Sequence, residues 1–197
     1  MSAIVLGIEN LDSVIDLLKN RSFFSKQTNK DQVWENLISK TQHALSDRSR
    51  DRIIGYFVND SLEAILAQSF SNRIPIWIMQ YYATKTNNIL LGKGYGEPLE
   101  ACFIKAMTDA EAIGIYDFWW SVPVKYAKNG PRMQKSSPSW IRYEVYTDAV
   151  ISANTFPKYE LHTQAYGSVL KPHDVFIRHA VCKQEFRSVP LTRQYNF

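Results

Sequence analysis

The sequence predicts an α/β (α+β) domain with a mixed, mostly antiparallel central sheet of about seven strands flanked by helices. Two observations predict this class. A strand pattern is followed by two helical patterns, then by three consecutive strand patterns, and finally by a helix and further strands. With 197 residues, of which 45% are hydrophobic, the chain is long enough to form one sizeable core. We therefore expect a single domain over residues 1–187, with residues 188–197 as a C-terminal tail.

The first part of the chain is predicted to be a strand followed by two helices. Ala3–Ile8 is a short apolar run of the kind that forms a strand. Apolar residues then recur at helical spacing over Leu11–Lys19, where Asn10 or Asp12 is the expected helix cap. A second helix is expected over about Lys30–Leu45.

A charged stretch and three strands follow these helices. Ser46–Arg52 alternates arginine with aspartate, and we interpret it as a solvated loop. Ile53–Val58 and Ser61–Phe70 are predicted to form an antiparallel hairpin, because the Asn-Asp pair between them is a tight-turn dipeptide. Ile74–Thr84 is rich in β-branched and aromatic residues, which favours a third long strand.

The second part of the chain is predicted to return to a helix and then to strands. A helix begins near Glu97 and ends at Gly114, a residue type that commonly terminates helices. Ile115–Val122 has the pattern of a buried strand. Glycine and proline interrupt Pro123–Trp140, which we interpret mostly as a loop.

The last two predicted strands are Ile141–Ile151 and Val175–Phe186, with a long loop, Asn154–Asp174, between them. Loops of this length in compact domains are usually functional or interfacial. Four aromatic or imidazole side chains in this loop could line an acceptor site or pack against another subunit: Tyr159, His162, Tyr166 and His173.

A glycine-rich loop precedes the helix that begins near Glu97. It reads Leu91-Gly92-Lys93-Gly94-Tyr95-Gly96. Glycines allow several backbone N–H groups to point to one side, and the following helix N-terminus adds a partial positive charge. This combination suits a pyrophosphate, and Lys93 adds a cation. The alternative is a plain strand-to-helix turn that needs glycine for its positive φ.

Together, the order of elements and the glycine loop resemble the acyl-CoA-dependent N-acyltransferases of the GNAT superfamily. That family carries Gln/Arg-x-x-Gly-x-Gly/Ala at the start of its third helix, and Gly94 and Gly96 match the two glycines of the pattern. Leu91 stands where the family has Gln or Arg. The resemblance covers most of the chain, from about Ile4 to Phe186.

The resemblance implies that acetyl-CoA is the co-substrate and that an amine, on a small molecule or a protein, accepts the acetyl group. In this family the fourth strand diverges from the fifth, and the thioester bonds to exposed backbone of the fourth strand, here Tyr81 to Ala83. Tyr126 is the nearest match to the tyrosine that acts as the acid. The cofactor-binding residues implied are Tyr82, Ala83, Gly92, Lys93, Gly94, Tyr95 and Gly96.

Two other functions stay open at this point. Leu91 and the interrupted Pro123–Trp140 segment favour a GNAT-like domain without catalysis that acts as a binding or structural part. His173–Arg187 loosely resembles bacteriophage proteins, which suggests a phage-encoded member and, for the non-catalytic alternative, a part of the virion. A nucleic-acid-binding module would rest only on the net charge of +4, and the chain has no polybasic arm.

Cysteine and histidine spacing argues against a metal site. Cys102 and Cys182 have no Cys-x-x-Cys partner, and the four histidines lack ligand spacing. We expect both cysteines to be reduced and buried, as in cytoplasmic proteins. His173 and Asp174 form an adjacent pair where the last predicted strand starts; neighbours in a strand point to opposite faces, so the two should not form a dyad. Neither a signal peptide nor a membrane span is predicted.

Overall fold

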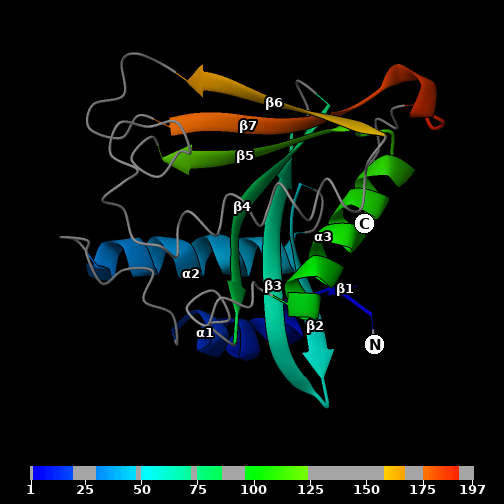
Figure 1. Ribbon diagram of the computed structural model, residues 1–197. Coiled ribbons are helices and arrows are strands. Elements are labelled where there is room, and N and C mark those ends of the chain that lie inside the picture. Colours follow the sequence, from blue (N-terminus) through cyan, green and yellow to red (C-terminus); the bar gives the residue numbers. More distant parts are fainter. Residues whose placement is uncertain are drawn as a thin grey trace.

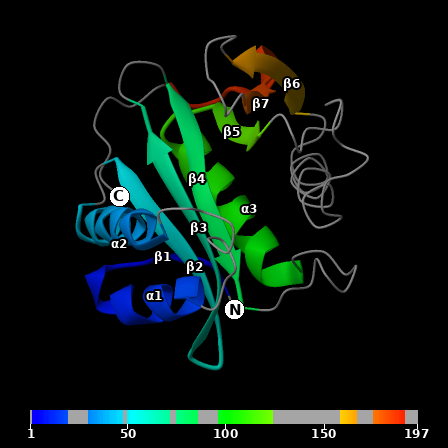
Figure 2. The ribbon, with the colours of Figure 1, turned by 90° about the vertical axis from the view of Figure 1, so that its left-hand side faces the viewer.

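The computed structural model describes residues 2–19, 30–47, 50–71, 75–85, 96–123, 158–166 and 175–190. It contains a seven-stranded sheet in the order β1-β2-β3-β4-β5-β7-β6. The neighbouring strands pair antiparallel except β4 and β5, which are parallel. Helices α1 and α2 lie on one face of the sheet and α3 on the other (Figure 2). The predicted class and strand number are confirmed.

The N-terminal elements differ slightly from the prediction. β1 covers only Ile4–Val5, and a 3-10 turn, η1 (Ile8–Asn10), leads into α1 (Leu11–Lys19). The strand ends early because Asn10 Oδ1 accepts a hydrogen bond from the Gly7 N–H at 3.0 Å. α2 covers Lys30–Ser46.

The predicted hairpin is confirmed. β2 (Asp51–Val58) and β3 (Ser61–Phe70) pair antiparallel. Asn59 and Asp60 between them have φ of 46° and 61°. Two consecutive positive φ angles define the type I′ turn, which Asn and Asp tolerate better than most residues.

The charged stretch Ser46–Arg52 is not wholly a solvated loop, because its last two residues belong to β2 and Arg52 is buried, so that interpretation was wrong there. Arg52 is 1% exposed, and its Nη1 lies 3.1 Å from Asp109 Oδ2 on α3. Burial lowers the Arg52 pKa to about 10, against the opposing effect of the Asp109 carboxylate. The guanidinium also lies over the Phe70 ring, 5.3 Å from its centre.

The central elements follow as predicted. β4 covers Ile76–Thr84, α3 covers Gly96–Ala112 and β5 covers Asp117–Pro123. Gly114 has φ 78° and ends α3, as its sequence position indicated. β5 begins two residues later than expected, because the residues directly after Gly114 complete the turn that ends α3.

The last two strands along the chain, β6 and β7, differ from the sequence prediction. β6, Tyr159–Tyr166, lies inside the segment that we expected to be a loop. β7 covers Val175–Cys182, and the residues after it form a 3-10 turn, η5 (Gln184–Phe186), rather than continuing the strand. The predicted strand Ile141–Ile151 lies outside the described residues. We call β5, β7 and β6 the wing, and β1 to β4 the body.

Tyr159 shows why the loop prediction failed. Its side chain is 6% exposed and packs in the core, with its ring 5.1 Å from that of Phe118. Its hydroxyl donates a hydrogen bond to Glu111 Oε1 at 2.8 Å. Tyr159 is therefore not the exposed acceptor-site or interface residue that the sequence suggested. His173 lies outside the described residues.

Apolar clusters cover both faces of the sheet. The α3 cluster joins body and wing, since it includes Leu66, Trp77, Phe103, Phe118 and Ala180. The α1/α2 cluster belongs to the body and includes Leu6, Leu18, Leu45, Ile53 and Ile65. In the described part of the chain, no helix is long and apolar enough to cross a membrane.

Candidate functional site

The parallel ladder between β4 and β5 is short. It consists of three residue pairs, from Ile76 with Asp117 to Ile78 with Trp119. Beyond them β4 continues to pair with β3 as far as Thr84, and β5 continues with β7 as far as Pro123. The two strands therefore diverge after Ile78 and Trp119, as Figure 1 shows. This is the divergence that the family resemblance implied.

The diverging segment of β4 also contains an irregularity. Ala67 of β3 pairs with Tyr81 while the next residue, Gln68, pairs with Met79, so Gln80 is an extra residue in β4. Gln80 is exposed. Such bulges bend a strand and re-aim its side chains, and they are common beside active sites. The bulge lies at the start of the segment that has left β5.

Tyr81 fixes this segment against α2. Its hydroxyl lies 2.7 Å from Thr41 Oγ1. The Thr41 hydroxyl already donates to the Leu37 carbonyl at 2.7 Å, so Tyr81 is the donor to Thr41. Burial raises the Tyr81 pKa to about 12, and the hydroxyl therefore stays protonated at neutral pH. This contact holds the bulged strand in position.

The predicted cofactor-binding residues fall into two groups. Tyr82 and Ala83 lie on the diverging segment of β4, where Tyr82 packs against the α3 cluster and Ala83 against the α1/α2 cluster. Gly96 is the first residue of α3, which starts at the same end of the sheet as β4 ends (Figures 1 and 2). The remaining predicted site residues lie outside the described residues: Gly92, Lys93, Gly94, Tyr95 and Tyr126.

A polar cluster lies at the start of the wing, and the sequence reasoning missed it. Asp117 Oδ1 accepts a hydrogen bond from Trp119 Nε1 at 2.7 Å and lies 3.5 Å from His179 Nδ1. The Trp119 and His179 rings are 5.3 Å apart. Burial raises the Asp117 pKa, while the Trp119 hydrogen bond, His179 and Arg187 offset part of the rise.

No local signal could have revealed this cluster. His179 meets Asp117 and Trp119 only because β7 pairs with β5 in a register that sets Trp119 opposite His179. The sequence offered His173 and Asp174 as the adjacent His-Asp pair, and those residues lie outside the described ones. The spatial pair comes from distant parts of the chain.

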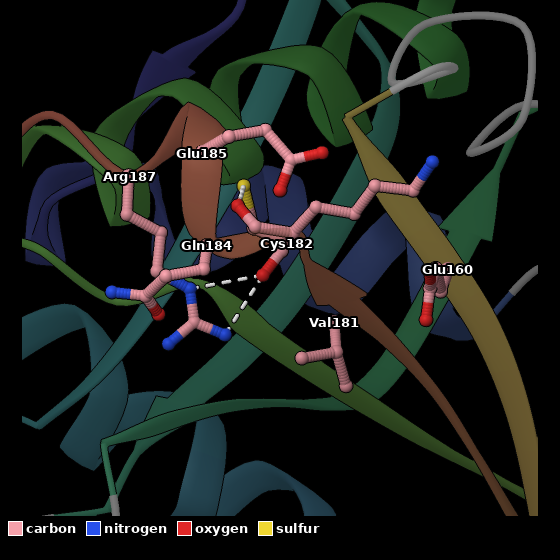
Figure 3. A pocket seen from close by; sticks show the side chains of 7 residues that line it. Glu160, Val181, Cys182, Gln184, Glu185 and Arg187 are labelled. Carbon is pink, nitrogen blue, oxygen red and sulfur yellow. Dashed lines mark hydrogen bonds between the residues drawn. The ribbon is translucent and has the colours of Figure 1, made fainter.

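A polar pocket of about 420 Å³ lies at the outer part of the wing (Figure 3). Residues of β6, of β7 and of the η5 turn with its flanking residues line it, among them Glu160, Lys183 and Glu185. Arg187 closes one side by donating two hydrogen bonds, at 2.9 and 2.8 Å, to the Cys182 carbonyl. None of its lining residues comes from β4, so this pocket is separate from the strand divergence.

The two cysteines are free and buried, as expected. Burial raises the Cys102 pKa to about 12, and it also raises the Cys182 pKa. Among the residues that the structure describes, no group of three or more His, Cys, Asp or Glu side chains could hold a metal ion.

The comparisons with known proteins give matches to solved structures, and these matches show the fold. No family model and no curated sequence matches the chain. A protein from Desulfovibrio desulfuricans assigned to the GNAT acetyltransferases superposes with a TM-score of 0.57, at 8% identity over 90% of this chain and 96% of that one. The spermidine N-acetyltransferase of Vibrio cholerae gives 0.53, at 11% identity over 92% and 95%.

A third similar structure contains coenzyme A. A ribosomal-protein L7/L12 α-N-acetyltransferase in complex with coenzyme A gives a TM-score of 0.51, at 12% identity over 92% of this chain and 95% of that one. At these identities the likeness establishes the fold. The chain therefore has the fold of the GNAT acetyltransferases.

Proposed function

We propose that the chain is an N-acetyltransferase of the GNAT superfamily that transfers an acetyl group from acetyl-CoA to a primary amine. The observation that carries the proposal is the divergence of β4 from β5 after Ile78 and Trp119. Strand backbone that leaves a ladder has N–H and C=O groups that can bond to a ligand instead of a neighbouring strand. An extended thioester arm is a ligand of that shape.

The proposed site divides acetyl-CoA between two elements. The backbone of Tyr82 and Ala83, on the diverging part of β4, would bond to the arm and polarise the thioester carbonyl. The glycine loop, Gly92 to Gly96, would direct its amides at the pyrophosphate, together with the first turn of α3. Lys93 would add a positive charge there.

Tyr126 completes the proposed machinery as the acid. Once the amine has attacked the carbonyl carbon, the leaving sulfur needs a proton, and a phenol near it can supply one. The acceptor is proposed to be a small-molecule or protein amine. Two of the structural neighbours described above act on such groups, one on spermidine and one on a protein α-amine.

Calorimetric titration with acetyl-CoA tests the proposal. We expect micromolar binding by the natural chain and about tenfold weaker binding by Lys93→Ala, since one phosphate contact contributes roughly 1–2 kcal/mol. The matched control is Lys85→Ala. Lys85 follows β4 directly, but its ammonium already bonds to Glu63 Oε1 at 3.1 Å and to Ser61.

A second variant separates the loop from the fold. Replacing Gly94 with leucine should abolish acetyl-CoA binding, because a side chain would occupy the space where the pyrophosphate approaches the backbone. Circular dichroism should show an unchanged fold. No heat of binding from the natural chain at millimolar acetyl-CoA would overturn the proposal.

The second candidate is a GNAT-like protein without catalysis, favoured by Leu91 in the place of the family's Gln or Arg. It would serve as a binding or structural part, and a role in a phage particle belongs to this candidate. A stable complex in pull-down experiments, together with no affinity for acetyl-CoA, would support it.

A further inference from the structure

The polar cluster of Asp117, Trp119 and His179 lies on the face of the sheet opposite α3. The proposed function assigns no role to these three residues. In β5 the side chains of Asp117 and Trp119 point to one face and Phe118 to the other, because neighbours in a strand alternate. Phe118 belongs to the α3 cluster. His179 pairs with Trp119 across the β5–β7 ladder, and so shares its face.

This face meets the strand divergence at Trp119. The last β4–β5 pair joins Ile78 to Trp119, and His179 is the register partner of Trp119 on the other side. The imidazole therefore stands one strand away from the point where β4 and β5 separate. A group bound between the separating strands would lie beside β5, and the His179 imidazole is on the next strand, β7.

The imidazole is held in a defined orientation. Its Nδ1 edge lies 3.5 Å from Asp117 Oδ1, and its ring lies against the Trp119 indole, with 5.3 Å between ring centres. The indole N–H also bonds to the same carboxylate oxygen at 2.7 Å, which fixes the carboxylate. The 3.5 Å separation is longer than a tight hydrogen bond, so the contact between the ring and the carboxylate is chiefly electrostatic.

The chemistry of this arrangement is that of an oriented base. A carboxylate beside Nδ1 favours the tautomer with its proton on Nδ1, and Nε2 then carries the lone pair. The His179 side chain is 18% exposed and that of Asp117 is 27% exposed, so both are partly shielded from water.

We propose that His179 is the general base of the acetyl transfer and that Asp117 is its positioning residue. This inference rests on the proposed function. His179 Nε2 removes one proton from the acceptor ammonium, and the resulting amine nitrogen attacks the thioester carbonyl carbon. The C–N bond forms, the C–S bond breaks, and the second proton lost from nitrogen ends on the coenzyme A sulfur. The imidazole returns its proton to solvent.

Other ionisable groups surround the base and belong in any analysis of its pH dependence. Asp117 faces it from β5, and Arg187, after η5, lowers the pKa of Asp117 by its charge. On β6, His162 is the register partner of His179, and Glu160 pairs with the neighbouring Val181. A pH profile must therefore be compared between variants rather than interpreted alone.

The test measures acetyl transfer from acetyl-CoA to spermidine and to a serine-initiated peptide, by release of the coenzyme A thiol. His179→Ala should lower kcat at least about 100-fold, the lower end of general-base effects, with unchanged acetyl-CoA affinity by calorimetry. Added imidazole should restore part of the rate to His179→Ala. The matched control, His43→Gln, changes an exposed histidine on α2 and should leave the rate unchanged.

Two further variants separate chemistry from folding. His179→Asn keeps a donor near the Nδ1 position but removes Nε2, so it should fold normally, lose the rate and lose the rise of kcat/KM with pH that the base produces. Asp117→Asn should lower kcat about tenfold or more without changing the KM for acetyl-CoA. If neither amine is a substrate, acetyl-CoA hydrolysis supplies the rate, since water also needs a base.

The outcomes distinguish this inference from the function on which it rests. A natural chain that binds and transfers acetyl groups, with His179→Ala within threefold of its rate, would overturn the base while leaving the transferase intact. A natural chain that does not bind acetyl-CoA would overturn both. Loss of rate with imidazole rescue would support both.

Discussion

The body and the wing of the sheet are built in different ways. In the body each strand pairs with its neighbour in sequence, from β2 to β4, and helices cover both faces. In the wing β7 lies between β5 and β6, so β7 pairs both with the strand just before it in the chain and with β5, which is far away in the chain. Three residue pairs connect the two regions through the parallel β4–β5 ladder. The candidate site lies at this connection, where the regular pairing of the body stops.

The largest expected loss of stability concerns the ion pair between Arg52 of β2 and Asp109 of α3, which joins α3 to the body. Asp109→Asn leaves the Arg52 guanidinium, 1% exposed, without its carboxylate. Losing one partner of a buried ion pair costs about 3–5 kcal/mol, so we expect a loss of this size in the free energy of unfolding, measured with urea. Removing both charges with Arg52→Met and Asp109→Leu should restore most of it. A loss below about 1 kcal/mol would show that the pair is effectively solvated.

A matched pair of substitutions compares the wing with the body directly. Tyr159→Phe removes the hydrogen bond from the wing to the Glu111 carboxylate, and should cost about 2 kcal/mol because the acceptor is charged. Tyr81→Phe removes the neutral bond from β4 to Thr41 and should cost about 1 kcal/mol. Equal losses in urea denaturation would contradict this difference in anchoring.

The smallest effect concerns the thiol under α3. Burial raises the Cys102 pKa from 9.0 to about 12, so the unfolded chain loses this proton first as the pH rises. Stability linked to Cys102 is therefore complete below pH 9 and falls between pH 9 and 12, by about 1 kcal/mol at pH 9.5. Cys102→Ala should flatten this part of the pH dependence of unfolding. An identical slope in the variant would exclude Cys102 as its source.

The sequence predicts the body well because its signals are local. The turn at Asn59 and Asp60, the helix end at Gly114 and the apolar patterns of β2 to β4 each depend on adjacent residues. The wing is harder, since β6 is largely polar and becomes a strand only by pairing with β7. Arg52 was misjudged for a similar reason, because its partner Asp109 comes from a distant helix.

The candidate site divides in the same way. The strand that carries Tyr82 and Ala83 could be predicted because its pattern is local. The motif at Gly94 and Gly96 depends on composition and order too, and its role at the site stays a prediction. The pairing of Asp117 with His179 depends on the register of two strands that meet only in the folded chain. Such a pair has no signature in a single sequence.

The short β4–β5 ladder has a mechanical consequence. Hydrogen bonds between body and wing are few, yet the apolar layer beneath α3 runs without interruption from Leu66 and Trp77 to Phe118 and Ala180. Directional bonds resist a change of angle, whereas apolar contacts tolerate small sliding movements. The connection can thus act as a hinge. The angle between the body and the wing can change slightly while the apolar residues beneath α3 remain in contact and shielded from water.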